Sequence, residues 1–81
     1  MYFVYIIQCE DGSLYTGITL DIERRFEQHK SCKGAKYTKS HKPVKIVYTE
    51  ECGTKVEALK REREIKGWKR EEKLKLIKSK I

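Results

Sequence analysis

Two tyrosines near the N-terminus, Tyr5 and Tyr15, lie on either side of a chain reversal at Glu10-Asp11-Gly12. Residues 2–9 and 14–20 are rich in β-branched and aromatic side chains, which predicts two strands joined as a hairpin. A phenol donates and accepts hydrogen bonds, and it exchanges a proton near neutral pH only when its surroundings lower its pKa from about 10. Two phenols side by side are therefore candidates for acid–base chemistry.

The length of the turn decides whether the two phenols lie together. A two-residue turn sends them to opposite faces of the sheet. A three-residue loop, with Gly12 in the left-handed conformation, keeps them on one face. In that register Tyr15 pairs with Ile7, and Tyr5 lies opposite the bare backbone of Gly17. We expect this second arrangement.

A carboxylate falls in the middle of an apolar stripe on a later helix. The stripe consists of Ala58, Leu59 and Ile65, and at about 100° per residue Glu62 lies among them. Burial of an unpaired charge is costly, so such a residue either pairs with a cation or lines a cleft where it binds one. An ion pair to Arg25 or to a lysine is one alternative, and a functional site is the other.

Arg25 and His29 are four residues apart, so they lie on one face of a predicted helix over about residues 22–30 and edge the core. A guanidinium holds a fixed charge and a planar donor fork that suit a phosphate, and an imidazole exchanges a proton near neutral pH. Each residue alone is equally typical of ordinary packing at a helix margin. They become candidates only in combination with other groups.

The cysteines and the second histidine predict little chemistry. Cys9, Cys32 and Cys52 are odd in number and contain no Cys-x-x-Cys pair, which argues against a disulfide framework and a structural zinc site. We interpret them as reduced thiols. The alternative is a catalytic cysteine paired with His29 or His41, which nothing in the spacing supports.

Caps and apolar patterns predict the remaining elements. Asp21 is the expected N-cap of the first helix, and Pro43 begins a third strand whose apolar run ends at Tyr48. Thr54 opens a capping box, and Gly67 terminates the helix that follows. A last helix is expected to bury one stripe, with a tryptophan as a core anchor near its start; these residues are Trp68, Leu74, Ile77 and Ile81.

Charge and composition favour a polyanionic partner. The 81 residues carry a formal net charge of +7, and no acidic residue occurs from Gln28 to Thr49. Nucleic acid is the first candidate partner, although a solvated basic surface is the alternative. No apolar run approaches the ~20 residues that a bilayer requires, and no signal peptide is evident. We expect a single domain over residues 1–81 in the cytoplasm.

The candidate residues form a pattern that resembles the GIY-YIG nuclease superfamily. Tyr5 lies in "VYI", Tyr15 and Gly17 in "YTG", Arg25 and His29 in "DIERRFEQH", and Glu62 in "ALKREREIK". The stretches "AKYT…PVKIVY" and "EIKGW" resemble the small bacterial UPF0213 branch of that superfamily. The first motif reads Val-Tyr-Ile where the family name has Gly-Ile-Tyr. Tyr5 therefore aligns with the tyrosine of the family motif only if the motif is shifted by one residue.

The resemblance implies an α+β fold, with a three-stranded antiparallel sheet flanked by helices in the order β-β-α-β-α-α. It also implies phosphodiester hydrolysis with one divalent metal ion, Mg²⁺ or Mn²⁺, held by Glu62. Tyr5 would accept the proton of water, helped by Tyr15, while Arg25 would neutralise charge on the phosphate and His29 would orient the phosphate or a tyrosine. Substrate contacts are expected at Gly17, Lys33, Lys36, Tyr37, Thr38 and Lys39.

The implied substrate is nucleic acid, with DNA favoured over RNA and no role for a membrane. Such a short chain offers no separate recognition module, so we expect structure-selective endonucleolytic cleavage, or dependence on a partner protein or homodimer. Several nucleases of the superfamily use an asparagine near the end of the domain, and this chain contains no asparagine. The alternative is therefore a binding module for DNA or RNA that keeps the fold without turnover.

Overall fold

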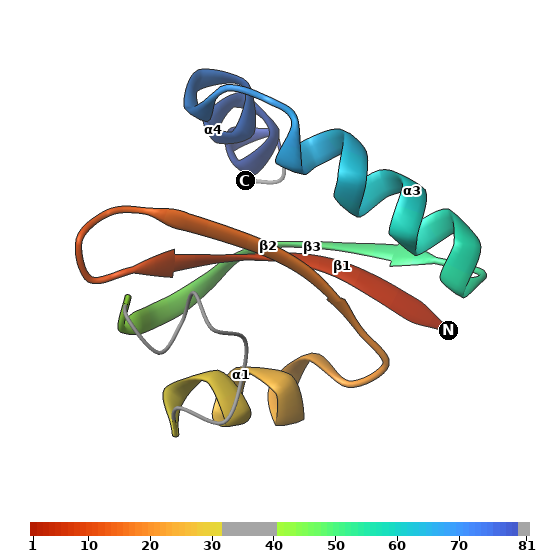
Figure 1. Ribbon diagram of the computed structural model, residues 1–81, viewed down its shortest axis with the longest axis horizontal. Helices are drawn as coiled ribbons and strands as arrows, with labels where there is room; N and C mark the ends of the chain where they lie inside the picture. Colours follow the sequence, from red (N-terminus) through yellow and green to blue (C-terminus); the bar gives the residue numbers. More distant parts are fainter. Residues whose placement is uncertain (32–40, 80–81) are drawn as a thin grey trace.

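The computed structural model describes residues 1–31 and 41–79 and shows a three-stranded antiparallel sheet in the order β2-β1-β3. Helix α1 covers one face of this sheet, and helices α3 and α4 lie over the other (Figure 1). None of the described helices is long and apolar enough to cross a membrane. The elements are β1 (Tyr2–Cys9), β2 (Leu14–Thr19), α1 (Ile22–Lys30), β3 (Pro43–Cys52), α3 (Lys55–Lys66) and α4 (Arg70–Lys78). The predicted α+β fold and its order of elements are confirmed.

The turn between β1 and β2 has the predicted three-residue geometry. Gly12 has a φ of 85°, in the left-handed region that an L side chain rarely adopts. Its N–H donates to the Cys9 carbonyl at 2.9 Å, and the Cys9 N–H donates to the Ser13 carbonyl at 2.8 Å. The resulting register pairs Tyr5 with Gly17 and Ile7 with Tyr15, as expected. Both tyrosines therefore lie on the same face of the hairpin.

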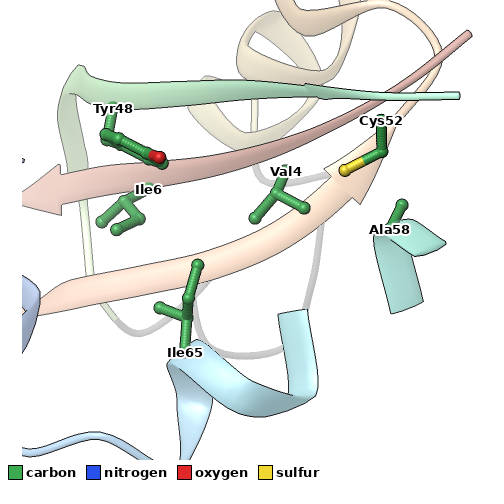
Figure 2. Close-up of a cluster of buried hydrophobic side chains, with 6 residues drawn as sticks. All are labelled: Val4, Ile6, Tyr48, Cys52, Ala58 and Ile65. Carbon is green, nitrogen blue, oxygen red and sulfur yellow. The ribbon is translucent and has the colours of Figure 1, made fainter. Parts of the chain in front are cut away.

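The central strand β1 is buried on both faces, so its alternating side chains enter two separate apolar clusters. Val4 and Ile6 point toward α3 and pack with Tyr48, Cys52, Ala58 and Ile65 (Figure 2). Tyr5, Ile7 and Cys9 form the second cluster, against which Tyr15 and Phe26 pack. The second cluster faces α1, so the two phenols are held by the smaller core.

The helix ends follow the local sequence. The Asp21 carboxylate accepts the Arg24 N–H at 3.1 Å and caps α1. At α3 the Thr54 hydroxyl accepts the Glu57 N–H at 3.2 Å, whereas the Glu57 carboxylate accepts from Gly53 and not from the cap residue itself. The predicted capping box is thus half formed, and both helices begin where expected.

Strand β3 continues past its apolar run, because pairing with β1 carries the polar residues as far as Cys52. Its register shifts twice, which leaves Val44 and Val47 without a partner on β1. Val44 is 54% exposed, whereas Val47 is partly buried and packs against the core. These bulges were absent from the predicted strand. The consecutive apolar residues Ile46, Val47 and Tyr48 break the alternation of a strand, but they do not show which residue is the extra one.

Two predicted core positions need correction or extension. Leu59 does not belong to the buried stripe of α3, since it is 36% exposed while Ala58 and Ile65 are fully buried. In α4, Ile77 packs against the core as expected, but Leu76 packs there and not the predicted Leu74, and no residue of this helix is fully buried. The predicted anchor Trp68, which precedes α4, also packs against the core. Ile81 lies outside the described residues.

Candidate active site

The phenol of Tyr5 is the centre of the candidate site. Its side chain projects from β1 and is only 2% exposed. A methyl group added at Gly17 would come within 2.6 Å of the Tyr5 hydroxyl oxygen and 3.2 Å of Tyr15 Cε2. The space beside Gly17 is thus already filled by the Tyr5 ring. This glycine therefore makes room for the phenol, whereas the sequence analysis expected a substrate contact at Gly17.

The Tyr15 ring packs near Tyr5 with a distance of 6.3 Å between ring centroids and a tilt of 48°. This tilted arrangement brings the two aromatic rings together. Strand β2 carries Tyr15 and is an edge strand, so its side chain is only partly buried. The two phenols therefore lie side by side, as predicted.

His29 is the direct partner of Tyr5. Its Nε2 atom lies 2.9 Å from the Tyr5 hydroxyl oxygen, and its ring meets the Tyr15 ring edge-on at 5.2 Å between centroids. The imidazole is fully buried, although the sequence placed it at the edge of the core. The imidazole therefore contacts the Tyr5 phenol from within the core.

Arg25 extends from the same helix into a half-buried position. Its Nη1 donates to Oε1 of Gln28 at 3.0 Å, a pair three residues apart that the sequence analysis did not consider. Arg25 and Gln28 also line a shallow pocket of ≈ 350 Å³ between the end of β2 and the start of α1. The guanidinium thus reaches both the tyrosine cluster and a concave, open surface.

Glu62 and Lys66 complete the arrangement from α3. Lys66 Nζ lies 3.6 Å from Oε1 of Glu62, whose side chain is 19% exposed, and 5.8 Å from the centroid of the Tyr15 ring. Helix α3 lies on the face of the sheet opposite α1 (Figure 1), and β2, which carries Tyr15, is an edge strand of that sheet. Sequence analysis missed Lys66, yet its spacing of four residues from Glu62 was a visible signal.

The electrostatics of the site follow from burial and from Arg25. Burial raises the pKa of Tyr5 to about 12; the Arg25 guanidinium opposes this rise, while Tyr15 and Glu62 add to it. Burial, together with the charge of Arg25, lowers the pKa of His29 to about 4. At neutral pH the Tyr5–His29 pair is consequently an uncharged phenol and an uncharged imidazole.

The donor set at Glu62 suits a divalent cation of the Mg²⁺ type. Such an ion keeps most of its waters and takes one or two protein carboxylates. The described residues contain no cluster of three or more His, Cys, Asp or Glu side chains that would form an all-protein metal cage. The ammonium of Lys66 already occupies a cation position beside the Glu62 carboxylate. A single-carboxylate site therefore fits this geometry, whereas a zinc-type site does not.

The other candidate residues lie elsewhere. Nδ1 of His41 lies 2.8 Å from Oδ2 of Asp11 at the hairpin turn. Cys9 and Cys52 are buried free thiols whose pKa burial raises, which fits their interpretation as unreactive. The expected substrate-contact residues of the basic loop are outside the described residues; these are Lys33, Lys36, Tyr37, Thr38 and Lys39.

Comparisons with known proteins find relatives that match almost the whole chain. A family model described as the GIY-YIG catalytic domain matches residues 1–75. UPF0213 proteins of Staphylococcus saprophyticus and Staphylococcus aureus are each 57% identical, over 94% and 95% of this chain and 93% and 94% of their own lengths. The solution NMR structure of a UPF0213 protein from Bacillus halodurans has a TM-score of 0.64 at 44% identity, covering 99% of this chain and 86% of that one.

Proposed function

Because the chain belongs to the GIY-YIG family, whose catalytic domain is of nuclease type, we propose that it is a metal-dependent nuclease that hydrolyses DNA phosphodiester bonds. One observation carries the proposal: four elements that are distant in sequence bring their polar side chains together around one phenol. These side chains are Tyr5, Tyr15, Arg25, His29 and Glu62. The proposed unit is one domain over residues 1–81.

Tyr5 is the proposed acceptor of the proton from the attacking water. A buried phenol with a pKa near 12 carries its proton at pH 7. It must therefore release that proton to solvent before it can accept one from water, and its charge environment must change to favour this release. The guanidinium of Arg25 already favours the phenolate, whereas the carboxylate of Glu62 opposes it. Neutralising the charge of Glu62 therefore lowers the pKa of Tyr5 and favours the phenolate, the form that can act as a base.

His29 is the proposed positioning residue for Tyr5. Its low pKa keeps the imidazole uncharged at pH 7, so it is not a general acid there. When Nε2 carries the ring proton, it donates to the Tyr5 oxygen and stabilises the phenolate. The proposed base therefore requires this tautomer of His29.

Arg25 and Glu62 are the proposed groups for the phosphate and the metal ion. The Arg25 guanidinium, half exposed beside a pocket, is suited to neutralise charge that grows on the phosphate in the transition state. Glu62 is the proposed ligand of Mg²⁺ or Mn²⁺. When bound, such an ion supplies charge neutralisation at the phosphate and a more acidic water molecule.

The proposed substrate is DNA, bound through its backbone by basic side chains. The exposed cations of the C-terminal helix and the segment before it are Lys69, Arg70, Lys75 and Lys78, and the loop lysines predicted from sequence would add to them. Such contacts grip phosphates without selecting a sequence. We therefore propose endonucleolytic cleavage in the cytoplasm that is selective for DNA structure, with a partner protein or homodimer contributing any further selectivity.

The test is cleavage of a labelled panel of nucleic acids. Linear duplex, single-stranded, flapped and four-way-branched DNA and one RNA are incubated with Mg²⁺, Mn²⁺ or EDTA. Metal-dependent cleavage should disappear in Glu62→Gln and persist in Glu51→Gln, an exposed carboxylate on β3. Cleavage that survives in Glu62→Gln would overturn the assigned role of this carboxylate.

A second candidate function is a non-catalytic module that binds DNA or RNA. Two observations favour it: the Tyr5 pKa is raised and not lowered, and the Glu62 carboxylate is already paired with Lys66. Binding without cleavage under every metal condition would support this candidate. The relative affinities for the DNA and RNA members of the panel would then identify its partner.

A further inference from the structure

We propose that Lys66 occupies the cation position at Glu62 in the metal-free protein, and that it transfers to a phosphate of the nucleic acid when the metal ion binds. This inference rests on the proposed function, because it assumes a metal ion at Glu62. It adds a residue to the site and predicts that metal and nucleic acid bind cooperatively.

The first argument is the burial of Glu62. Its side chain is only 19% exposed, so water solvates the carboxylate poorly and a nearby cation is needed to stabilise the charge. Lys66 Nζ, at 3.6 Å from Oε1, provides that cation. Since the pair is four residues apart on α3, the helix holds both groups on one face.

The second argument is that two cations compete for one carboxylate. A divalent ion at Glu62 repels the ammonium of Lys66 and removes its partner. The Lys66 side chain is 49% exposed and has a flexible four-carbon stem, so its ammonium can leave without a change in the backbone. Displacement of Lys66 therefore accompanies metal binding.

The third argument concerns where the released ammonium goes. Lys66 Nζ lies 5.8 Å from the Tyr15 ring, at the edge strand of the site. A phosphate bound between Arg25 and this edge brings negative charge within reach of the free ammonium. A phosphate of the nucleic acid thus replaces the Glu62 carboxylate as the partner of the Lys66 ammonium. Metal binding and nucleic-acid binding therefore become cooperative.

The first experiment measures Mn²⁺ binding without nucleic acid, by the EPR signal of free Mn²⁺. Lys66→Met should bind Mn²⁺ about two- to fivefold more tightly than wild type, the range expected for removal of a partly exposed ion pair. Lys60→Met is the matched control, because this exposed lysine lies on another side of α3. It should bind Mn²⁺ like wild type, and thermal melts should show both variants folded.

The second experiment measures binding of a fluorescent DNA hairpin in EDTA and in Ca²⁺, by anisotropy. In wild type, Ca²⁺ should strengthen DNA binding. In Lys66→Met this enhancement should shrink, and DNA binding in Ca²⁺ should become weaker than in wild type. The opposite signs of the two effects, tighter metal and weaker DNA, exclude general damage to the site.

Three outcomes would overturn the inference. Unchanged or weaker Mn²⁺ binding in Lys66→Met shows that the lysine does not compete with the metal. An unchanged Ca²⁺ enhancement shows that it does not move to the nucleic acid. Unaltered Mn²⁺ binding in Glu62→Gln shows that the metal lies elsewhere, and only this outcome also removes the metal site of the proposed function.

Discussion

The hydroxyl of Tyr5 and Nε2 of His29 are 2.9 Å apart inside the protein, where neither side chain is more than 2% exposed. This contact joins β1 to α1 across 24 residues of sequence. The central hydrogen bond of the candidate site is consequently also part of the core between the sheet and the first helix. Substitutions here should change stability and activity together.

Replacement of His29 should separate these two contributions. His29→Ala leaves the buried Tyr5 hydroxyl without its partner and opens a cavity, so unfolding in urea should show a loss of about 2–4 kcal/mol. His29→Gln restores a hydrogen-bonding group and should recover part of the stability. If His29 positions Tyr5, the kcat of cleavage should fall while KM changes little. The glutamine variant should recover part of kcat.

The buried imidazole also predicts a pH dependence of stability. Its pKa falls from an ordinary 6.5 to about 4 on folding, so the unfolded chain binds more protons between these values. The contribution of His29 is therefore complete above about pH 6.5 and is lost as the pH falls toward 4. Urea titrations should show up to about 3 kcal/mol less stability at pH 4 than at pH 7 from this group. The slope should diminish in His29→Gln, and an unchanged slope would contradict the assignment.

Gly17 should not tolerate a side chain. In Gly17→Ala the new methyl group would lie 2.6 Å from the Tyr5 oxygen, so the phenol must move and lose its contact with His29. We expect a destabilisation of about 1–3 kcal/mol and loss of cleavage. Gly67→Ala is the matched control, because its added methyl group meets no atom closer than 3.5 Å and its φ of −78° suits alanine. It should be neutral or slightly stabilising.

A double variant tests the stated cause of the Gly17 effect. Tyr5→Leu removes the hydroxyl and the outer ring atoms that would collide with the methyl group. The destabilisation by Gly17→Ala should therefore be smaller in the Tyr5→Leu background than in wild type, a coupling measured by a double-mutant cycle in urea. Equal costs in both backgrounds would indicate a backbone effect.

The hairpin illustrates what the sequence predicts well. Gly12 and its neighbours determine a turn of known geometry, and the turn sets the register that places Tyr5 opposite Gly17. Local rules suffice there because each partner lies within about twelve residues. The bulges at Val44 and Val47 depend on pairing with a distant strand, so the apolar pattern alone does not locate them.

In the candidate site, too, some features follow from local sequence and others depend on packing between distant elements. The spacing around Glu62 predicted a carboxylate at a core position and gave an ion pair to Arg25 or a lysine as one alternative, and Lys66 forms such a pair. The depth of His29 was not predictable, because an arginine and a histidine four residues apart look alike on a helix margin. Only packing of α1 against β1 decides that His29 is buried and Arg25 half exposed.

The two phenols should differ in their effect on turnover. Tyr5→Phe removes the proposed proton acceptor, and we expect at least a ~100-fold loss of single-turnover rate, typical of a general base. Tyr15→Phe keeps the ring that packs against His29, so a loss of about tenfold or less is expected. Both variants should retain metal binding through Glu62. Equal losses would show that the site does not distinguish the phenols, and the base would need reassignment.

The position of α3 depends on Arg61, the residue before Glu62. Arg61 Nε donates to both oxygens of Glu50 on β3, at 3.0 and 3.2 Å, and its Nη1 lies 2.7 Å from Glu64. Its guanidinium also lies 5.2 Å from the Trp68 ring centroid. The paired side chains of Arg61 and Glu50 are 25% and 27% exposed, so solvent screens them only in part.

Removal of one partner of this pair should cost more than removal of both. Arg61→Met leaves the Glu50 carboxylate half buried without its cation, and urea unfolding should show a loss of about 1–3 kcal/mol. Glu50→Gln keeps a hydrogen-bond acceptor for Arg61 and should cost less. Adding Glu50→Gln to Arg61→Met should recover part of this loss, because no charge is then left unpaired. Since Arg61 anchors the helix that carries Glu62, Arg61→Met should also weaken Mn²⁺ binding. Strictly additive losses of stability would show that Glu50 and Arg61 are not coupled. Unaltered Mn²⁺ affinity would show that their contact does not position the site.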